Sequence, residues 1–418
     1  MKKTRKQKSS RLKISQSFFN KTLIFLFLLF LPTQLGRHFF FDFSYISGIR
    51  IDYLAPTIYI TDILAILLFV FNWRRVIVCF NNTKVLFVLL LLTINMLFAP
   101  SFFLGLYRFV KIIEILGIYA IVRHADFAKS MANWWALTAG ALLELAIATI
   151  QFVRGSSIGG LFYFLGERIV SLSLPGIAKS SIDGVEMLRP YATFSHPNSM
   201  GGFYVMIYAL ALFAPQLKGK AVLKSLLLFA AATLVLFSFS KIAIVTLCAV
   251  SLILTIKKFP KSDCPLCVFA KIITIIGLSA VFIFAHGDPN SLVNRLMLID
   301  NAFILIKAHL VQGVGLGNYL IAQAILPINL PYGIPQPVHN IFLLLISEVG
   351  VMISALIAAF AIFEFRRLWK LEIFRVCLFV FLATASFDHY WVTLQQNTLL
   401  LGVIGGIIVG SLKAKRQN

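Results

Sequence analysis

The chain is dominated by apolar segments long enough to cross a lipid bilayer as helices. A helix needs about 20 apolar residues to span the hydrocarbon core, and about 17 suffice for a short span. On this criterion we count about twelve candidate segments. They run roughly over residues 21–36, 56–72, 85–99, 101–122, 132–152, 199–215, 225–239, 241–256, 268–285, 340–363, 376–387 and 396–412. The predicted fold class is therefore all-α, a polytopic transmembrane helix bundle occupying residues 21–412.

Two interpretations stay open around Ser240 and Lys241. The apolar segments on either side are two separate spans, or they form one tight re-entrant hairpin. Together with the short eleventh segment, at 376–387, this choice leaves the span count open by one or two.

Composition excludes a soluble globular domain. Hydrophobic residues make up 59% of the 418 residues and charged residues only 13%, whereas a soluble domain carries about 25% charged residues. The net charge of +22 would suggest a nucleic-acid partner in a soluble chain. Here, however, 27 of the 38 Lys and Arg lie in the N-terminal tail, in alternate short loops and at the C-terminus, as the positive-inside rule requires of cytoplasmic segments. We expect the bilayer as a partner and no nucleic acid.

Both ends of the chain are predicted to be cytoplasmic, with basic tails over residues 1–20 and 413–418. No small-residue cleavage site follows Leu31-Pro32-Thr33. The first apolar segment is therefore predicted to be an uncleaved signal anchor.

Two large loops, at about 153–198 and 286–339, fall on the non-cytoplasmic face in this topology. They are long, interrupted by Gly and Pro, and carry most of the polar residues outside the cytoplasm. Loops of this kind frequently carry function. We expect the chemistry of the protein there.

The first candidate segment, residues 188–198, ends the first large loop and reads Leu-Arg-Pro-Tyr-Ala-Thr-Phe-Ser-His-Pro-Asn. Arg189 is placed to hold a phosphate at the membrane surface, because guanidinium stays charged and binds phosphate through two hydrogen bonds. His196 and Asn198 are predicted to support the site. Arg295 is the matching arginine of the second loop, and a flexible turn at 313–319 follows it.

Two further segments contain imidazole and carboxylate groups. His339 and Asn340 lie at the mouth of a span, where a histidine can accept and donate a proton near neutral pH. Asp388, His389 and Tyr390 lie between the last two spans and resemble a sugar-binding or acid/base shell.

Structural roles are the alternative for each of these residues. Arg189 and Arg295 can reach toward lipid headgroups at the interface. His196 and His339 can cap helices or order loops. Tyr390 and Trp391 fit an aromatic belt at the interface, which is the preferred interpretation for Trp391.

Ionisable residues also occur inside predicted spans. Arg108, Lys111 and Glu114 recur at a spacing of three, so they share one helix face and Lys111 can pair with Glu114. Arg108 is nearest the outer end and is predicted to join the external pocket.

Together, two arginines, a histidine and an acid from separate loops are assigned to one face of the bilayer. A basic pocket at a bilayer surface suits an amphiphile with an anionic head. A lipid-linked pyrophosphate is the predicted ligand.

These segments resemble the O-antigen ligase and O-antigen polymerase family of bacterial envelope proteins. The resemblance rests on residues 188–198, on Arg295 with Gly-Val-Gly-Leu-Gly-Asn-Tyr at 313–319, and on His339-Asn340 with Glu348-Val-Gly. It covers about residues 186–400. Ala192 and Lys241 depart from the glycine and arginine of many members, and Lys241 keeps the charge without the guanidinium fork.

The resemblance implies a GT-C-like glycosyltransferase in the bacterial cytoplasmic (inner) membrane, with its active site on the outer face. It implies transfer of a glycan from undecaprenyl pyrophosphate to a glycan, lipid or protein acceptor, by a metal-independent inverting reaction without a cofactor. Arg189 and Arg295 would hold the pyrophosphate and His339 would activate the acceptor hydroxyl. Ligase and polymerase activity stay open because they differ only in the acceptor, and a lipid-linked glycan flippase is the alternative from another class.

Overall fold

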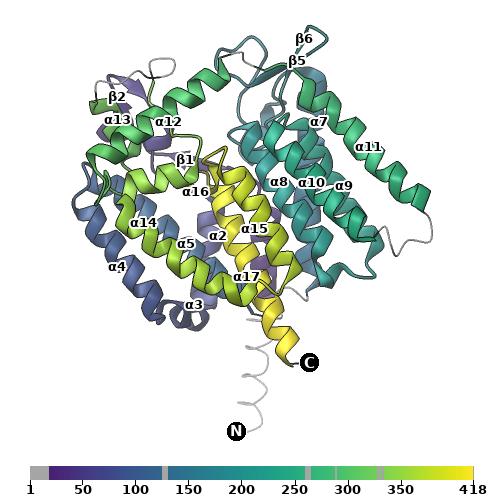
Figure 1. The fold of residues 1–418 in the computed structure, drawn as a ribbon, viewed down its shortest axis with the longest axis horizontal. Coiled ribbons are helices and arrows are strands. Elements are labelled where there is room, and N and C mark those ends of the chain that lie inside the picture. The colour runs from purple at the N-terminus through teal and green to yellow at the C-terminus, as the bar shows by residue number, and fades with distance from the viewer. Residues whose placement is uncertain are drawn as a thin grey trace.

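The computed structural model describes residues 18–124, 130–258, 265–287, 290–326, 330 and 334–417. Most of them are helical, and the helices lie side by side as a bundle (Figure 1). Most of the predicted N-terminal tail, residues 1–17, lies outside the described residues, whereas only residue 418 of the predicted C-terminal tail does. Helix α17 continues to Gln417, beyond the predicted end of the last span at residue 412.

The first part of the chain begins with an apolar helix at Phe18–Leu29. The helices that follow are α2 (Ile60–Phe71), α3 (Trp73–Phe80), α4 (Thr83–Leu97), α5 (Phe102–Val122) and α7 (Met131–Arg154).

The middle and C-terminal parts continue the bundle. They contain α8 (Pro197–Phe213), α9 (Ala221–Phe237), α10 (Lys241–Lys258), α11 (Pro265–Phe284), α12 (Ser291–Ala308), α13 (Tyr319–Ile325), α14 (Ile341–Leu368), α15 (Glu372–Ala385), α16 (Tyr390–Thr393) and α17 (Gln395–Gln417).

Three antiparallel strand pairs lie in the segments between helices, and the all-α prediction omitted them. The pairs are β1 (Gly36–His38) with β4 (Thr57–Tyr59), β2 (Tyr45–Ile46) with β3 (Ile49–Arg50), and β5 (Lys179–Ile182) with β6 (Val185–Leu188). Their strands have two to four residues, too few for a hydrophobic alternation to stand out in the sequence.

Three described helices are long and apolar enough to cross a membrane, namely Met131–Arg154, Ile341–Leu368 and Gln395–Leu412. The pair α2 and α3, bent by 91° at its break, makes a fourth if it is counted as one span. Several other predicted spans correspond to shorter apolar helices, such as Thr83–Leu97 and Ala221–Phe237. The mostly helical membrane architecture is confirmed, whereas the count of about twelve stays a prediction.

The segment predicted as the second large loop contains helices of its own. Helices α12 and α13 occupy much of 286–339. The turn between them packs on the kink of α14, where Gly350 has φ +78° and ψ 168°, a conformation that residues with a Cβ rarely adopt. The kink frees carbonyl groups of α14, and Val314 N and Gly315 N donate to Ser347 O and Glu348 O at 2.8 and 2.9 Å. The turn is therefore fixed by hydrogen bonds to α14.

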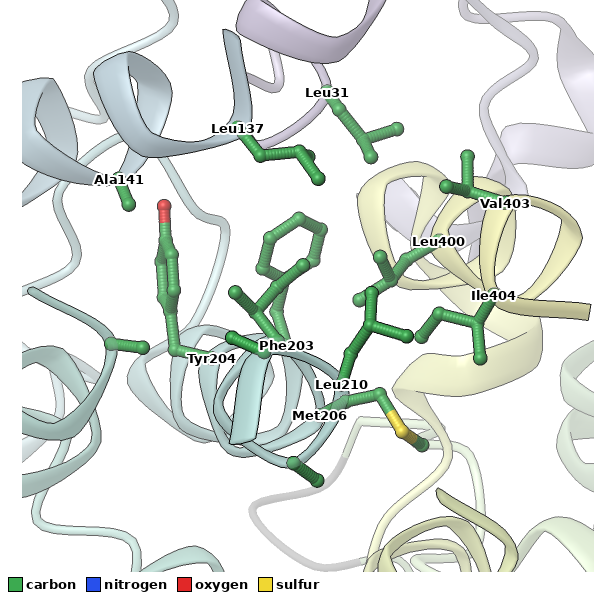
Figure 2. Packing of buried hydrophobic residues seen from close by; sticks show 14 of the residues in the cluster. Leu31, Leu137, Ala141, Phe203, Tyr204, Met206, Leu210, Leu400, Val403 and Ile404 are labelled. Carbon is green, nitrogen blue, oxygen red and sulfur yellow. The ribbon is translucent and has the colours of Figure 1, made fainter. Parts of the chain in front are cut away.

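Helix α8 is the centre of the largest apolar cluster (Figure 2). Phe203 and Tyr204 face Leu137 and Ala141 of α7, while Leu210 faces α17. Because lipid tails are as apolar as these side chains, close packing holds such helices together. This buried helix begins at Pro197, so it fixes the position of the segment 188–198.

Candidate active site

Asp388 lies at the centre of the candidate site, in the connection between α15 and α16, and is only 5% exposed. Its Oδ1 accepts a hydrogen bond from the backbone N–H of His389 at 2.8 Å. Its Oδ2 accepts one from Asn198 Nδ2 at 3.0 Å. Burial alone would raise the pKa of Asp388, but the neighbouring histidines, His339 first, outweigh burial and lower it below its usual range. The carboxylate is therefore ionised at neutral pH.

Arg189 joins this centre through Asn198. Its Nε and one terminal nitrogen donate to Ser238 O at the end of α9, at 3.0 and 2.8 Å, and that nitrogen also donates to Asn198 Oδ1 at 2.5 Å. Burial lowers the pKa of Arg189 to about 10, so the guanidinium keeps its charge at neutral pH. Asn198 thus bridges the predicted phosphate-binding arginine and the central carboxylate.

His196 caps α8, which is the structural role named above as the alternative to a role in the site. Its Nδ1 accepts the backbone N–H of Asn198 at 3.1 Å. Burial, followed by the charge of Arg189, lowers the pKa of His196 to about 3. The imidazole is therefore neutral and holds the start of α8.

His339 lies directly before α14 and presents a side chain that is 25% exposed. Its Nδ1 is 3.4 Å from Asp388 Oδ1, and this buried nitrogen makes no hydrogen bond within the described part of the chain. Asn340 caps α14 by accepting Leu343 N–H at 3.0 Å and donates to Ser386 O at 3.1 Å. The N-terminus of α14 is thereby tied to the segment that carries Asp388.

His389 is buried next to Asp388. Its ring lies 5.2 Å from that of His339 and 5.5 Å from that of Tyr53, centroid to centroid. Its Nδ1 is 2.7 Å from Thr393 Oγ1. Burial lowers the pKa of His389 to about 3, more than the Asp388 carboxylate raises it. His389 is therefore neutral at physiological pH.

Two arginines from distant helices bind the backbone of the same segment. Arg295 of α12 donates to Phe387 O at 3.2 Å. Arg108 of α5 donates to Val392 O at 3.4 Å, and its place in an external pocket stays a prediction. We call residues 386–393, with the side chains that bind them, the catalytic connection.

Tyr390 and Trp391 are buried in the bundle, at 1% and 0% exposure. The aromatic-belt interpretation of Trp391 is therefore wrong, because its indole N–H donates to Thr384 Oγ1 at 2.8 Å inside the protein. Tyr390 fills the space beside Gly202, where any Cβ would collide with its hydroxyl. The catalytic connection is thus packed directly onto the start of α8.

Sequence reasoning missed Arg168, which donates to Ser195 O at 3.0 Å, and also Tyr53 and Thr393. These residues belong to no recognisable motif, and only tertiary contacts place them at the site. The one available signal for Arg168 was its position in the first large loop.

Three side chains of the catalytic connection are able to hold a metal ion. One ligand atom each from His339, Asp388 and His389 lies within 4.8 Å of the other two. The sequence had predicted no metal.

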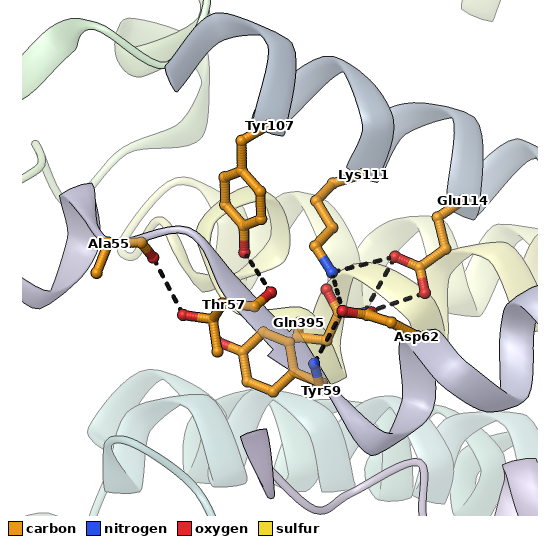
Figure 3. Close-up of polar contacts among 8 residues, drawn as sticks. All are labelled: Ala55, Thr57, Tyr59, Asp62, Tyr107, Lys111, Glu114 and Gln395. Carbon is orange, nitrogen blue, oxygen red and sulfur yellow. Dashed lines mark hydrogen bonds and ion pairs between the residues drawn. The ribbon is translucent and has the colours of Figure 1, made fainter. Parts of the chain in front are cut away.

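A second charged cluster lies between α2, α5 and α17 (Figure 3). Lys111 pairs with Glu114 at 3.4 Å, which confirms the predicted pair, and with Asp62 at 2.6 Å. Gln395 Nε2 donates to Asp62 at 2.5 Å and to both oxygens of Glu114 at 3.2 Å. We call these four residues the Lys111 cluster.

Residues 198–358 match the family model described as O-antigen ligase. This part of the chain is therefore similar to O-antigen ligases. The match falls within the region of about 186–400 where the sequence shows the resemblance. A search of curated proteins gave no match to the chain.

The matched residues 198–358 include Asn198, Arg295 and His339, whereas Arg189 precedes them and Asp388 follows them in the sequence. Asn198 is hydrogen-bonded to both Arg189 and Asp388, which places these two residues beside the matched region. The family is membrane-embedded and its members are glycan-processing enzymes. The apolar helices and this partial match together indicate a membrane protein that resembles O-antigen ligases over residues 198–358.

Proposed function

We propose that this protein transfers a glycan from an undecaprenyl-pyrophosphate carrier to an acceptor hydroxyl on the outer face of the bacterial cytoplasmic membrane. One observation carries the proposal. Arg108, Arg295 and His339 come from three different helices or helix ends and converge on the connection that holds Asp388. Cationic groups around a carboxylate–imidazole pair suit a substrate with an anionic leaving group.

The reaction is a single inverting displacement in this proposal. The acceptor oxygen forms a bond to the anomeric carbon of the donor while the bond from that carbon to the pyrophosphate oxygen breaks. The hydroxyl proton of the acceptor passes to His339. The lipid pyrophosphate leaves as an anion and needs no proton at neutral pH.

The position of Asp388 supports His339 as the base. Because Nδ1 of His339 faces the Asp388 carboxylate at 3.4 Å, Nε2 is the nitrogen left for the acceptor. A proton on Nδ1 directed at Asp388 would fix the tautomer and stabilise the imidazolium that forms. General-base catalysis of this kind contributes about 10²- to 10⁴-fold.

Arg189 and Arg295 would stabilise the charge that grows on the pyrophosphate. Each well-placed donor in a dry site contributes about 3 kcal/mol to such a transition state. Arg295 donates one hydrogen bond to Phe387 O, and its other N–H groups are available to a phosphate oxygen. Arg189 is held in place by Ser238 and Asn198.

Ligase and polymerase share this donor chemistry. A ligase takes a lipid A core sugar or a protein hydroxyl as acceptor, and a polymerase takes another lipid-linked glycan. The acceptor therefore has to be found by experiment.

The test is reconstitution of the purified protein in liposomes with a defined lipid-linked oligosaccharide and separate candidate acceptors. We expect a new glycosidic bond and release of the lipid pyrophosphate with one acceptor class. Movement of the lipid-linked glycan across the bilayer without bond formation would contradict the proposal and support a flippase. His286→Ala is the matched control variant, because the exposed side chain of His286 lies outside the catalytic connection.

A further inference from the structure

Three potential metal ligands of the catalytic connection converge on one point. Asp388 Oδ1 lies 3.4 Å from His339 Nδ1 and 3.9 Å from His389 Nε2. One ligand atom from each of the three residues lies within 4.8 Å of the other two. Two donor atoms bound to one tetrahedral Zn²⁺ lie about 3.3 Å apart, given metal–ligand bonds of about 2.0–2.1 Å. The three atoms are therefore close to the spacing that a single bound ion requires.

The His339 nitrogen in this group is buried and makes no hydrogen bond within the described residues. Buried polar atoms are almost always paired in folded proteins. At 3.4 Å its contact with the carboxylate is longer than an ordinary hydrogen bond. In the other neutral tautomer, with the proton on Nε2 instead of Nδ1, a lone pair on this atom is free to bind a cation.

His389 is held in the tautomer that a metal ligand needs. Thr393 Oγ1 donates its only proton to His389 O at 3.0 Å and so accepts from His389 Nδ1 at 2.7 Å. A neutral His389 then carries its proton on Nδ1, and the lone pair of Nε2 points toward Asp388. Two acceptor atoms that face each other repel unless a cation lies between them.

The carboxylate is oriented in the same way. Asn198 Nδ2 holds Oδ2 at 3.0 Å, and the His389 backbone N–H holds Oδ1 at 2.8 Å. Metal sites depend on such partners, which fix the tautomer and orientation of their ligands. The exposed quarter of the His339 side chain leaves a route from solvent.

We propose that His339 Nδ1, Asp388 Oδ1 and His389 Nε2 bind a transition-metal ion of the Zn²⁺ class, and that this ion inhibits glycan transfer. Two imidazoles and a carboxylate favour zinc and neighbouring transition metals over magnesium or calcium, which prefer oxygen ligands. The inhibitory part rests on the proposed function. An ion on Nδ1 of His339 leaves the ring proton on Nε2, and the acceptor then meets a donor instead of a base. Glycan transfer itself stays independent of metal.

The test is calorimetric titration of the detergent-purified full chain, without a polyhistidine tag, with ZnCl₂. We expect one Zn²⁺ per chain for wild type and His286→Ala, and loss of that binding in His339→Ala and His389→Ala. Thr393→Val removes only the partner of His389 and should weaken binding about 10- to 100-fold. Thr393→Val leaves the three metal ligands in place and changes the side-chain volume little. It therefore still tests the site if a histidine variant fails to fold.

No Zn²⁺ binding by wild type, or unchanged affinity in folded His389→Ala and Thr393→Val, would overturn the site. In the transfer assay, Zn²⁺ should lower the wild-type rate and EDTA should restore it. Binding without loss of transfer would overturn the inhibitory role. Calorimetry does not depend on transfer, so an absence of transfer with every acceptor would count against the proposed function and leave the metal site standing.

Discussion

The Lys111 cluster and the catalytic connection both place ionisable groups inside the helical bundle, yet they differ in how completely those groups are paired. In the Lys111 cluster the ammonium contacts two carboxylates, and Gln395 donates to both of them. In the catalytic connection Nδ1 of His339 and the hydroxyl of Tyr390 are buried without a hydrogen bond in the described residues. We expect the saturated network to stabilise the fold, whereas the unpaired atoms beside cations suit the substrate site proposed above.

The largest effect is expected at His339. His339→Ala should lower the rate of glycan transfer about 10²- to 10⁴-fold, because it removes the proposed general base. The measurement is the transfer rate per folded protein, with His286→Ala as control. A transfer rate close to that of wild type would show that His339 is not the general base.

A substitution of Arg295 tests whether a cation in the catalytic connection stabilises the leaving pyrophosphate. Arg295→Ala should lower transfer about 10²- to 10³-fold, because a donor to the leaving pyrophosphate is lost. Arg154→Ala is the matched control, since this exposed arginine ends α7 outside the catalytic connection. Equal transfer rates for Arg295→Ala and Arg154→Ala would show that Arg295 does not stabilise the pyrophosphate.

The opposite behaviour is expected in the saturated cluster. Lys111→Met leaves Asp62 and Glu114 without their cation, and breaking a buried ion pair in this way costs about 3–5 kcal/mol of stability. The thermal unfolding midpoint in detergent should fall, while the transfer rate per folded molecule stays near that of wild type. An unchanged midpoint would show that the cluster does not stabilise the bundle.

The smallest effect concerns pH and His196. The fold keeps His196 and His389 neutral, with pKa values lowered to about 3, so each gains a proton on unfolding once the pH falls below its ordinary pKa of 6.5. The unfolding midpoint should therefore fall as the pH decreases from 6.5 toward 4. Asp388 affects the unfolding midpoint only at lower pH. Its ionised form stabilises the fold above the ordinary pKa of 3.8, and this contribution is lost as the pH falls below that value.

His196→Asn isolates this effect. Asparagine keeps an oxygen that can cap α8 but does not titrate, so the fall of the midpoint with decreasing pH should be shallower. A slope identical to that of wild type would exclude His196 as a source of acid sensitivity.

The sequence was sufficient for the helical membrane class and for several site contacts. Spacing alone predicted the pair Lys111–Glu114, and Arg189, Arg295, His339 and Asp388 were expected near one another. The pair follows from helical periodicity, which is a local property, whereas the convergence of the four site residues was expected because their loops were assigned to one face of the bilayer.

Other features depend on contacts between distant segments. The burial of Trp391 is set by Thr384 and the bundle around it, and Asp62 reaches Lys111 only because α2 packs on α5. The kink at Gly350 depends on the turn that binds it. A single sequence contains no signal for these pairings, which explains why Arg168, Tyr53 and Thr393 were also missed.

The most direct measurement compares His339→Ala with Lys111→Met in one reconstituted assay, with glycosidic bond formation from a lipid-linked glycan normalised to folded protein. The account predicts that His339→Ala is folded but nearly inactive, and that Lys111→Met is less stable but active when folded. Transfer near the wild-type rate by His339→Ala, or loss of transfer in folded Lys111→Met alone, would contradict it.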